Sequence, residues 1–180
     1  MTSSDKTLIL PAVAMSTPVT IHTIGHSSHP LETFIGLLQQ HYIQTLVDVR
    51  SQPYSRRYPQ FNREELAAAL TSAGIEYVDL GNSLGGRPSQ ADLYRPGSER
   101  PDYDRQAQTP TYQAGLRQLC EQAAGATTAM MCSEGDPEEC HRTLLITPSL
   151  LDLGHTVIHI LPDGRLRPAE RRAKQLGFGF

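Results

Sequence analysis

The sequence has no tryptophan, only three cysteines and no long apolar run, and each shortage excludes a class of protein. Three cysteines cannot all pair within one chain, and 180 residues can bury a core without disulfides, so we expect a reducing, cytoplasmic compartment. No apolar stretch approaches the roughly 20 residues needed to span a bilayer, so we expect no membrane partner. A net charge of −3 gives no overall attraction to nucleic acid, and such binding would need a local basic patch.

What the sequence does contain is the composition of one globular domain, with 38% hydrophobic and 19% charged residues. We predict a flexible N-terminal tail over residues 1–18, a single α/β domain over 19–164 and a basic C-terminal tail over 165–180. The apolar stretch in the first tail is broken by Pro11 and follows little basic charge, which does not fit a signal peptide.

Strand and helix patterns alternate along the domain. Runs rich in β-branched and apolar residues predict strands at 19–26, 45–50, 75–80, 127–132 and 156–161. Helices are predicted behind Pro30, from a capping-box pair of Asn62 and Glu65, over 111–125, and after Asp136, Pro137 and Glu139, where Pro148 should kink or split the last helix. The alternation predicts the α/β class, with a mostly parallel sheet of about five strands and helices on both faces, a Rossmann-like three-layer sandwich.

One connection, over residues 81–110, is much longer than the others and is rich in Gly, Pro, Arg and Tyr. Connections of this length are usually functional loops or disordered inserts, and the composition suits either.

Polar residues gather where the predicted strands end, which is the edge of a parallel sheet where ligands bind. His26 is a candidate general acid or base, Asp48 an orienting carboxylate and Cys132 a nucleophile or wall residue. Arginine and aromatic residues alternate after the second strand, a mixture that suits phosphate and stacked bases. The expected substrate-binding residues are Ser27, Arg50, Arg56, Arg57, Arg87 and Arg142.

The stretch from Cys132 to Arg142 admits several interpretations. A metal ion could be held by Cys132, Cys140 and His141, or completed by His22, His26 or His29, although the cysteines lie farther apart than the usual two to four residues of compact zinc sites. The acidic residues between them disfavour a phosphatase-like thiolate loop. The two thiols could also form a redox pair, or simply be buried beside a helix cap.

Four segments in order resemble the domain-of-unknown-function family 488 over roughly residues 20–160: TIGHSSHPLETFIGLL, LVDVRSQPYSRRYPQFN, IEYVDLGNSLGGRP and MCSEGDPEECHR. The resemblance implies a set of characteristic residues that coincides with the strand-end residues above, but it implies no reaction. They are Gly25, His26 and Ser27; Asp48, Arg50, Arg56, Arg57, Gln60 and Phe61; Leu84, Gly85, Gly86 and Arg87; and Cys132, Glu134, Cys140, His141 and Arg142.

Two functional hypotheses follow. The first is an enzyme, a hydrolase or transferase, acting on a phosphate-bearing substrate such as a nucleotide or nucleic acid. The alternative is a metal- or thiol-dependent binding or sensing module, associated with DNA maintenance. In addition, Gln175, Phe178 and Phe180 resemble the peptides that dock in the hydrophobic groove of the bacterial sliding clamp.

Overall fold

A six-stranded sheet forms the centre of the computed structural model, which describes residues 17–138 and 140–171. The strand order is β3-β2-β4-β1-β5-β6, with the first five strands parallel and β6 antiparallel to β5. The predicted α/β class and mostly parallel sheet are confirmed. The strands are β1 (Thr20–Gly25), β2 (Thr45–Asp48), β3 (Glu76–Asp79), β4 (Thr128–Cys132), β5 (Thr156–Ile160) and β6 (Leu166–Pro168).

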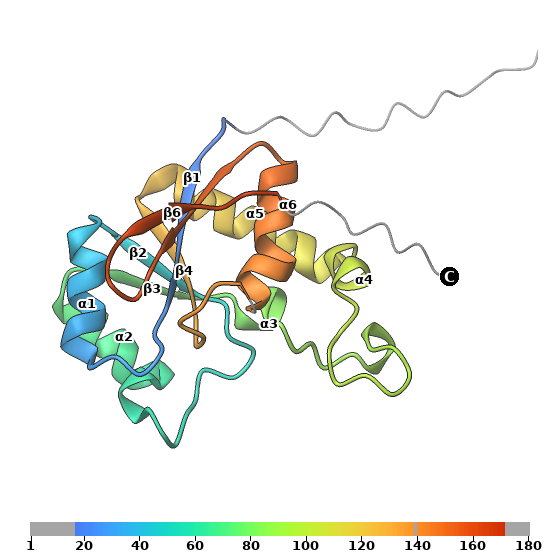
Figure 1. The fold of residues 1–180 in the computed structure, drawn as a ribbon, viewed down its shortest axis with the longest axis horizontal. Helices are drawn as coiled ribbons and strands as arrows, with labels where there is room; N and C mark the ends of the chain where they lie inside the picture. Colours follow the sequence, from blue (N-terminus) through green and yellow to red (C-terminus); the bar gives the residue numbers. More distant parts are fainter. Residues whose placement is uncertain (1–16, 139, 172–180) are drawn as a thin grey trace, which may run out of the picture.

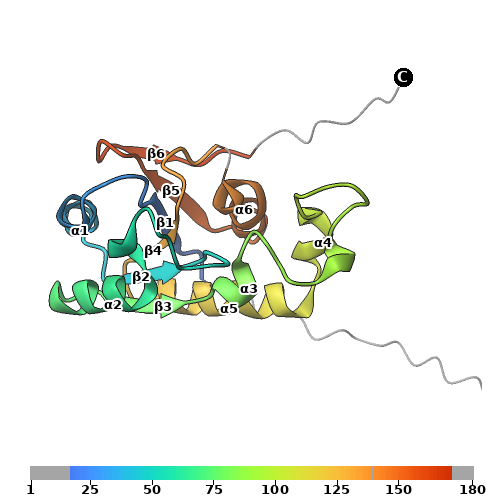
Figure 2. The same cartoon turned by 90° about the horizontal axis from the view of Figure 1, so that it is seen from below.

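Helices cover both faces of this sheet (Figures 1 and 2). Helices α1 (Leu31–Gln40) and α2 (Arg63–Ser72) pack on one face, in a core that includes Phe34 and Leu66. Helices α5 (Pro110–Gly125) and α6 (Thr147–Asp152) pack on the other, around Leu116 and Leu150. Every residue of β2 and β4 is buried, as expected for central strands covered twice, and the three-layer arrangement is confirmed.

The sixth strand corrects the prediction of a tail that begins at residue 165. Gly164 turns the chain back with φ +81°, and the following residues pair with β5. All three residues of β6 are exposed. Because the strand has no buried face, its sequence lacks the apolar alternation from which a strand is predicted. Residues 1–16 and 172–180, which include the clamp-like peptide over 175–180, lie outside the described residues.

One predicted helix start is confirmed in position but not in its cap, and the other is wrong. Asn62 precedes α2 but does not form the capping box, because its side-chain oxygen accepts a hydrogen bond from the Ser55 backbone N–H at 2.8 Å instead. The last helix does not begin near Asp136, which caps only a turn by accepting from the Glu138 N–H at 2.9 Å. It begins with a π-helical turn over Arg142–Ile146 and continues without a break as α6 from Thr147, so the helix changes type beside Pro148, where a kink or split was predicted. Glu139 lies outside the described residues.

The long connection over 81–110 is folded. It contains α3 (Gly81–Leu84), a 3-10 turn over Ala91–Leu93 and α4 (Tyr103–Ala107). The buried Gln106 side chain donates to the Gly85 carbonyl at 2.8 Å and ties α4 to the end of α3. This segment lies beside the carboxyl ends of the strands, which favours a functional loop. Within the part of the chain that the structure describes, no helix is long and apolar enough to cross a membrane.

Candidate functional site

The site lies where the central strands β2, β4 and β1 end side by side. The connection that leaves β1 leads to α1 on one face, whereas the connection that leaves β4 leads to α6 on the other, so the two loops diverge and leave a crevice. Backbone hydrogen bonds from His26 N to the Cys132 carbonyl (3.0 Å) and from Ser27 N to the Ser133 carbonyl (2.9 Å) hold the two strand ends together.

Four potential metal ligands meet at the end of β4: Cys132, Glu134, Cys140 and His141. Their donor atoms all lie within 4.8 Å of one another. A zinc ion with bonds of about 2.0 to 2.3 Å places its ligand atoms roughly 3.3 to 3.8 Å apart. The distances from Cys132 Sγ to His141 Nδ1 (3.4 Å), from Cys140 Sγ to His141 Nδ1 (3.8 Å) and from Cys140 Sγ to Glu134 Oε2 (3.3 Å) match that range. The distance from Cys132 Sγ to Glu134 Oε2 is shorter, at 2.6 Å, and Glu134 is the exposed residue of the four, whose side chain can adjust.

The imidazole of His141 is oriented as in a metal ligand. Its Nε2 lies 2.9 Å from the Val49 carbonyl oxygen, which can only accept, so Nε2 carries a proton and, when the ring is neutral, Nδ1 presents its lone pair to the thiols. Gly86 makes room for this ring, because a Cβ atom there would lie 2.6 Å from the Cβ of His141. The end of β2 and the long connection, both far from His141 in the sequence, therefore position its ring.

The two thiols cannot both ionise easily without a cation. A hydrogen bond from Cys140, together with those of His141 and Glu134, lowers the pKa of Cys132 well below its usual value, despite burial. The same hydrogen bond, burial and the negative charge of Cys132 raise the pKa of Cys140. Burial acts to lower the pKa of His141, but its hydrogen bond to the Cys132 thiolate and the charge of that thiolate raise it overall. A divalent cation between the sulfur atoms would stabilise both thiolates and keep the histidine neutral.

Arg142 holds in place the loop after β4 that carries Glu134, which we call the ligand loop. Its side chain is 1% exposed, and Nη2 donates to the carbonyls of Glu134 (2.7 Å) and Gly135 (3.2 Å). Its Nε and Nη1 atoms are buried without a partner, and no carboxylate of the described residues pairs with it. A buried guanidinium without a carboxylate calls for negative charge nearby, and a metal site with two thiolates and a carboxylate would supply it.

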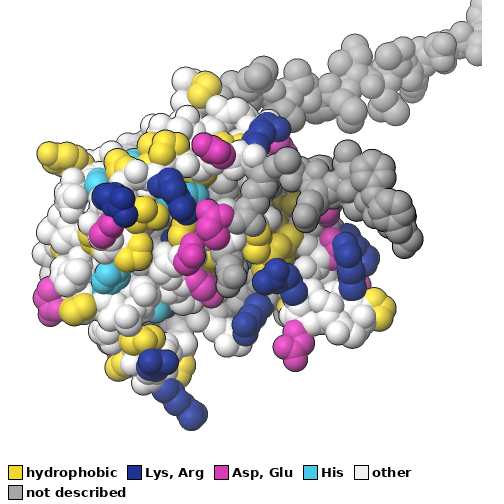
Figure 3. Space-filling view, viewed as in Figure 1, with side chains coloured by type: hydrophobic (Ala, Val, Ile, Leu, Met, Phe, Trp, Pro, Cys, Tyr) yellow, Lys and Arg dark blue, Asp and Glu magenta, His cyan; other side chains and the backbone are white. Residues whose placement is uncertain are grey.

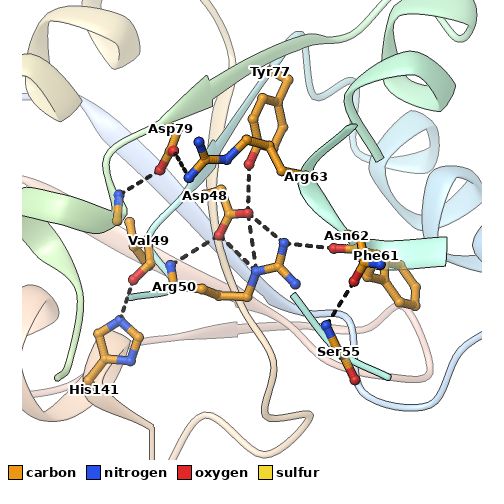
Figure 4. Close-up of polar contacts among 11 residues, drawn as sticks. Asp48, Val49, Arg50, Ser55, Phe61, Asn62, Arg63, Tyr77, Asp79 and His141 are labelled. Atoms are coloured by element: carbon orange, nitrogen blue, oxygen red, sulfur yellow. Dashed lines mark hydrogen bonds and ion pairs between the residues drawn. The ribbon is translucent and has the colours of Figure 1, made fainter. Parts of the chain in front are cut away.

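Asp48 and Arg50 form a buried ion pair at the end of β2 (Figure 4). Arg50 donates from Nη2 to Asp48 Oδ2 at 2.6 Å and from Nε to Oδ1 at 2.9 Å, and Nη2 also donates to the Phe61 carbonyl at 2.8 Å. Tyr77 on β3 donates a further hydrogen bond to this carboxylate, from its hydroxyl to Asp48 Oδ2 at 2.8 Å. Asp48 therefore orients Arg50, as one of its predicted roles required, and lines no part of the crevice.

His26 is buried against Phe61, with ring centroids 4.3 Å apart and the planes nearly parallel at 17°. Its Nδ1 lies 2.9 Å from the Ser27 carbonyl oxygen, so Nδ1 carries the proton and Nε2 is the acceptor. Burial lowers the pKa of His26 to about 4, which keeps the ring neutral at pH 7. The carboxyl end of β1 thus presents a neutral proton acceptor, which fits the predicted base more than the predicted acid.

The crevice has two lobes. The metal lobe, of about 470 Å³, lies over the ligand cluster and is walled by the long loop through Gly86, Arg87, Arg100 and Tyr103. The histidine lobe, of about 500 Å³, is lined by His26, Ser27, Ser28, Arg57 and Tyr58. Both lobes share Arg50, Gln52, Tyr54, Ser133 and Glu134, so they form one continuous space large enough for a small substrate.

The structure gathers most of the predicted site residues here, with three exceptions, of which Asp48 beneath Arg50 is one. Arg56 lines neither lobe, and Arg142 is buried beneath the ligand loop rather than facing a substrate. Of the histidines proposed to complete a metal site, only His141 belongs to the cluster, and His22, His26 and His29 do not. The sequence analysis did not identify Glu134 as a ligand or Arg100 as a wall residue. The long loop was the signal for Arg100, whereas Glu134 looked like part of an acidic helix cap.

Comparison with protein families matches residues 30–147 to the family described as Domain of unknown function DUF488. The matched region includes the four potential metal ligands and Arg50, whereas His26 and Ser27 precede it. No curated protein and no solved structure matches the chain.

Proposed function

The chain belongs to the DUF488 family, whose description names no reaction, and we propose from the geometry of the site that it is a metal-dependent hydrolase. The observation that carries the proposal is the cluster of four donor atoms within 4.8 Å of one another on the wall of an open crevice. Two thiolates and an imidazole favour zinc among the common divalent ions. Structural zinc sites are closed by four protein ligands, whereas catalytic sites keep one position open to water or substrate, which suits a cluster that lines a crevice.

The residues divide into holding and reacting groups. Cys132, Cys140 and His141 would hold the ion, and His141 is kept in place by Val49. When bound, such an ion lowers the pKa of a coordinated water to about 7 and polarises a substrate oxygen. Glu134 is exposed beside the thiols, where its carboxylate can accept a proton from an attacking water or serve as the fourth ligand. Arg50 and Arg87 line the same lobe and can stabilise negative charge on the substrate.

Metal content tests this proposal directly. We expect the purified full chain, loaded with zinc and freed of excess, to retain about one equivalent by elemental analysis. Cys140→Ser should weaken zinc binding at least about tenfold in a competition titration with a chromophoric chelator. Cys120→Ser is the matched control, since Cys120 lies on α5, outside the cluster. Equal zinc affinity in all three proteins would refute the metal site.

Glu134→Gln tests the reaction. We expect this variant to lose about 10²-fold or more of the zinc-dependent hydrolysis of nitrophenyl esters, because the amide cannot accept a proton. It should still bind zinc through the two thiols and the imidazole. Undiminished turnover in Glu134→Gln would exclude Glu134 as the base.

A second function, thiol chemistry at Cys132, is supported by the lowered pKa of that thiol and by the neighbouring Cys140. It predicts rapid alkylation of Cys132 in protein as purified. The metal site predicts the opposite, with alkylation that is slow until a chelator is added.

A further inference from the structure

The histidine lobe holds polar groups that have no role in the protein's own hydrogen bonding. Arg50 uses Nε and Nη2 on Asp48 and Phe61, but Nη1 makes no hydrogen bond to the described residues and the side chain lines the lobe. Arg57 also lines the lobe and is exposed, with its guanidinium carbon 5.3 Å from the centroid of the Tyr58 ring. No carboxylate in the described ranges pairs with Arg57. Two arginines from the connection between β2 and α2 therefore line the same space.

The chain at Ser27 is held in an uncommon conformation. Ser27 has φ +50°, in the left-handed region, and both its backbone N–H and its carbonyl are engaged, with Ser133 and His26 respectively. Gly135 lies against it, because a Cβ atom there would be 2.9 Å from Ser27 Oγ. Backbone strain that is fixed from several sides is typical of ligand sites. Here it places the Ser27 hydroxyl beside the lobe, with no hydrogen-bond partner in the described part of the chain.

The lobe also contains one hydrogen-bond acceptor, Nε2 of His26. Because the Ser27 carbonyl requires the proton of His26 on Nδ1, the lone pair of Nε2 is available as an acceptor, with no donor among the described residues. His26 lines the lobe and is locked by its stack on Phe61. A ligand that satisfies the whole lobe must accept from arginine and serine and also donate one hydrogen bond to His26.

We infer that the histidine lobe binds the phosphate group of the substrate whose reacting bond lies over the metal cluster, an assignment that rests on the proposed hydrolase. Inorganic phosphate near neutral pH, and its monoesters below about pH 6, carry oxygens for the arginine and serine donors and also a proton that can be hydrogen-bonded to Nε2 of His26. Sulfate and carboxylates offer acceptors only, so either would leave Nε2 unpaired. The shared residues, Arg50 and Glu134 among them, connect this lobe to the metal lobe.

The surface favours a small phosphate compound over a long nucleic acid. On the face shown in Figure 3, basic side chains of the described residues are interspersed with acidic ones and form no broad basic tract. The net charge of −3 agrees with this distribution. Tyr54, which is 67% exposed and lines both lobes, is available to stack on an aromatic group attached to the phosphate.

The test is calorimetric titration of the zinc-loaded full chain with inorganic phosphate and with sulfate. We expect phosphate to bind about tenfold or more tightly than sulfate, because sulfate has no proton to donate to Nε2 of His26. Arg57→Ala should weaken phosphate binding about tenfold. Arg117→Ala is the matched control, since Arg117 is also exposed but lies on α5 and lines neither lobe, and this variant should bind phosphate like the unmodified chain. Equal affinity for phosphate and sulfate, or equal effects of the two substitutions, would overturn the assignment.

Two further arms separate the alternatives. Tighter binding of a mononucleotide than of phosphate would identify a small-molecule substrate, whereas tight binding of a short single-stranded oligonucleotide with a steep salt dependence would identify a nucleic-acid backbone as the source of the phosphate. Repeating the phosphate titrations in the Cys140→Ser background separates this inference from the proposed function. Phosphate binding that depends on Arg57 without the metal upholds the subsite even if the hydrolase proposal fails. If the unmodified chain retains zinc but shows no phosphate binding that depends on Arg57, the phosphate subsite is refuted and the metal site is not.

Discussion

Replacing Arg50 by Ala should destabilise the fold strongly, because it removes the cationic partner of a fully buried carboxylate. Asp48 is 0% exposed and Arg50 5%, and they are joined by contacts of 2.6 and 2.9 Å. Without the guanidinium, Asp48 keeps only neutral donors, the Tyr77 hydroxyl and the backbone N–H of residue 50. Breaking a buried pair in this way costs about 3 to 5 kcal/mol in the free energy of unfolding. At about 2 to 4 °C per kcal/mol for a chain of this size, the loss in Tm is roughly 6 to 20 °C.

Urea denaturation of the metal-free protein, followed by circular dichroism, measures this loss. Arg165→Ala is the matched control, because Arg165 contacts Asp163 at the same 2.6 Å but the two side chains are 78% and 51% exposed. That exposed pair should contribute about 0 to 1 kcal/mol. The double variant Asp48→Leu, Arg50→Met should recover most of the lost stability, since it removes both charges together. If Arg50→Ala costs no more than Arg165→Ala, the reasoning from burial is refuted.

Two other predictions concern buried groups near the site. Burial lowers the pKa of His159 to about 4, so the unfolded chain, with the ordinary value of 6.5, takes up a proton first as the pH falls. The stability from neutral His159 is complete above pH 6.5, falls by about 2 kcal/mol at pH 5, and levels off below pH 4. Urea denaturation at pH 7 and pH 5 gives the loss in the free energy of unfolding between these two pH values. This loss should be smaller by about 2 kcal/mol in His159→Gln than in the unmodified chain, and an equal loss in the two proteins would contradict the prediction. Arg142→Gln should weaken zinc binding about 10- to 100-fold, because Arg142 positions the ligand loop and supplies positive charge beside the thiolates. Chelator competition measures this effect; a lower Tm of the metal-free variant with unchanged zinc affinity would reduce Arg142 to a structural role.

Much of the site could be predicted because its residues sit at strand ends that the sequence marks. The runs around Asp48 and Cys132 are apolar up to a polar residue, and such a boundary indicates where a buried strand reaches the edge of the sheet. The metal site was harder to recognise. Seven residues separate Cys132 from Cys140, longer than in compact zinc motifs, and only the turn between them brings the sulfur atoms together. The orientation of His141 also depends on Val49 and Gly86, about 90 and 55 positions away in the sequence.

The class of fold, the five parallel strands and the residues at their ends can be predicted from hydrophobic periodicity and turn residues, because these are properties of consecutive positions. The strand order and the sixth strand became known from the structure. The structure also shows that Arg142 is buried in the protein and does not line the crevice. It brings four residues together in one cluster: Cys132, Glu134, Cys140 and His141. The physical reason is that strand neighbours and loop packing depend on contacts between distant segments, and no local pattern records them. Placing β4 between β2 and β1 brings Arg50, Cys132 and His26 to one crevice.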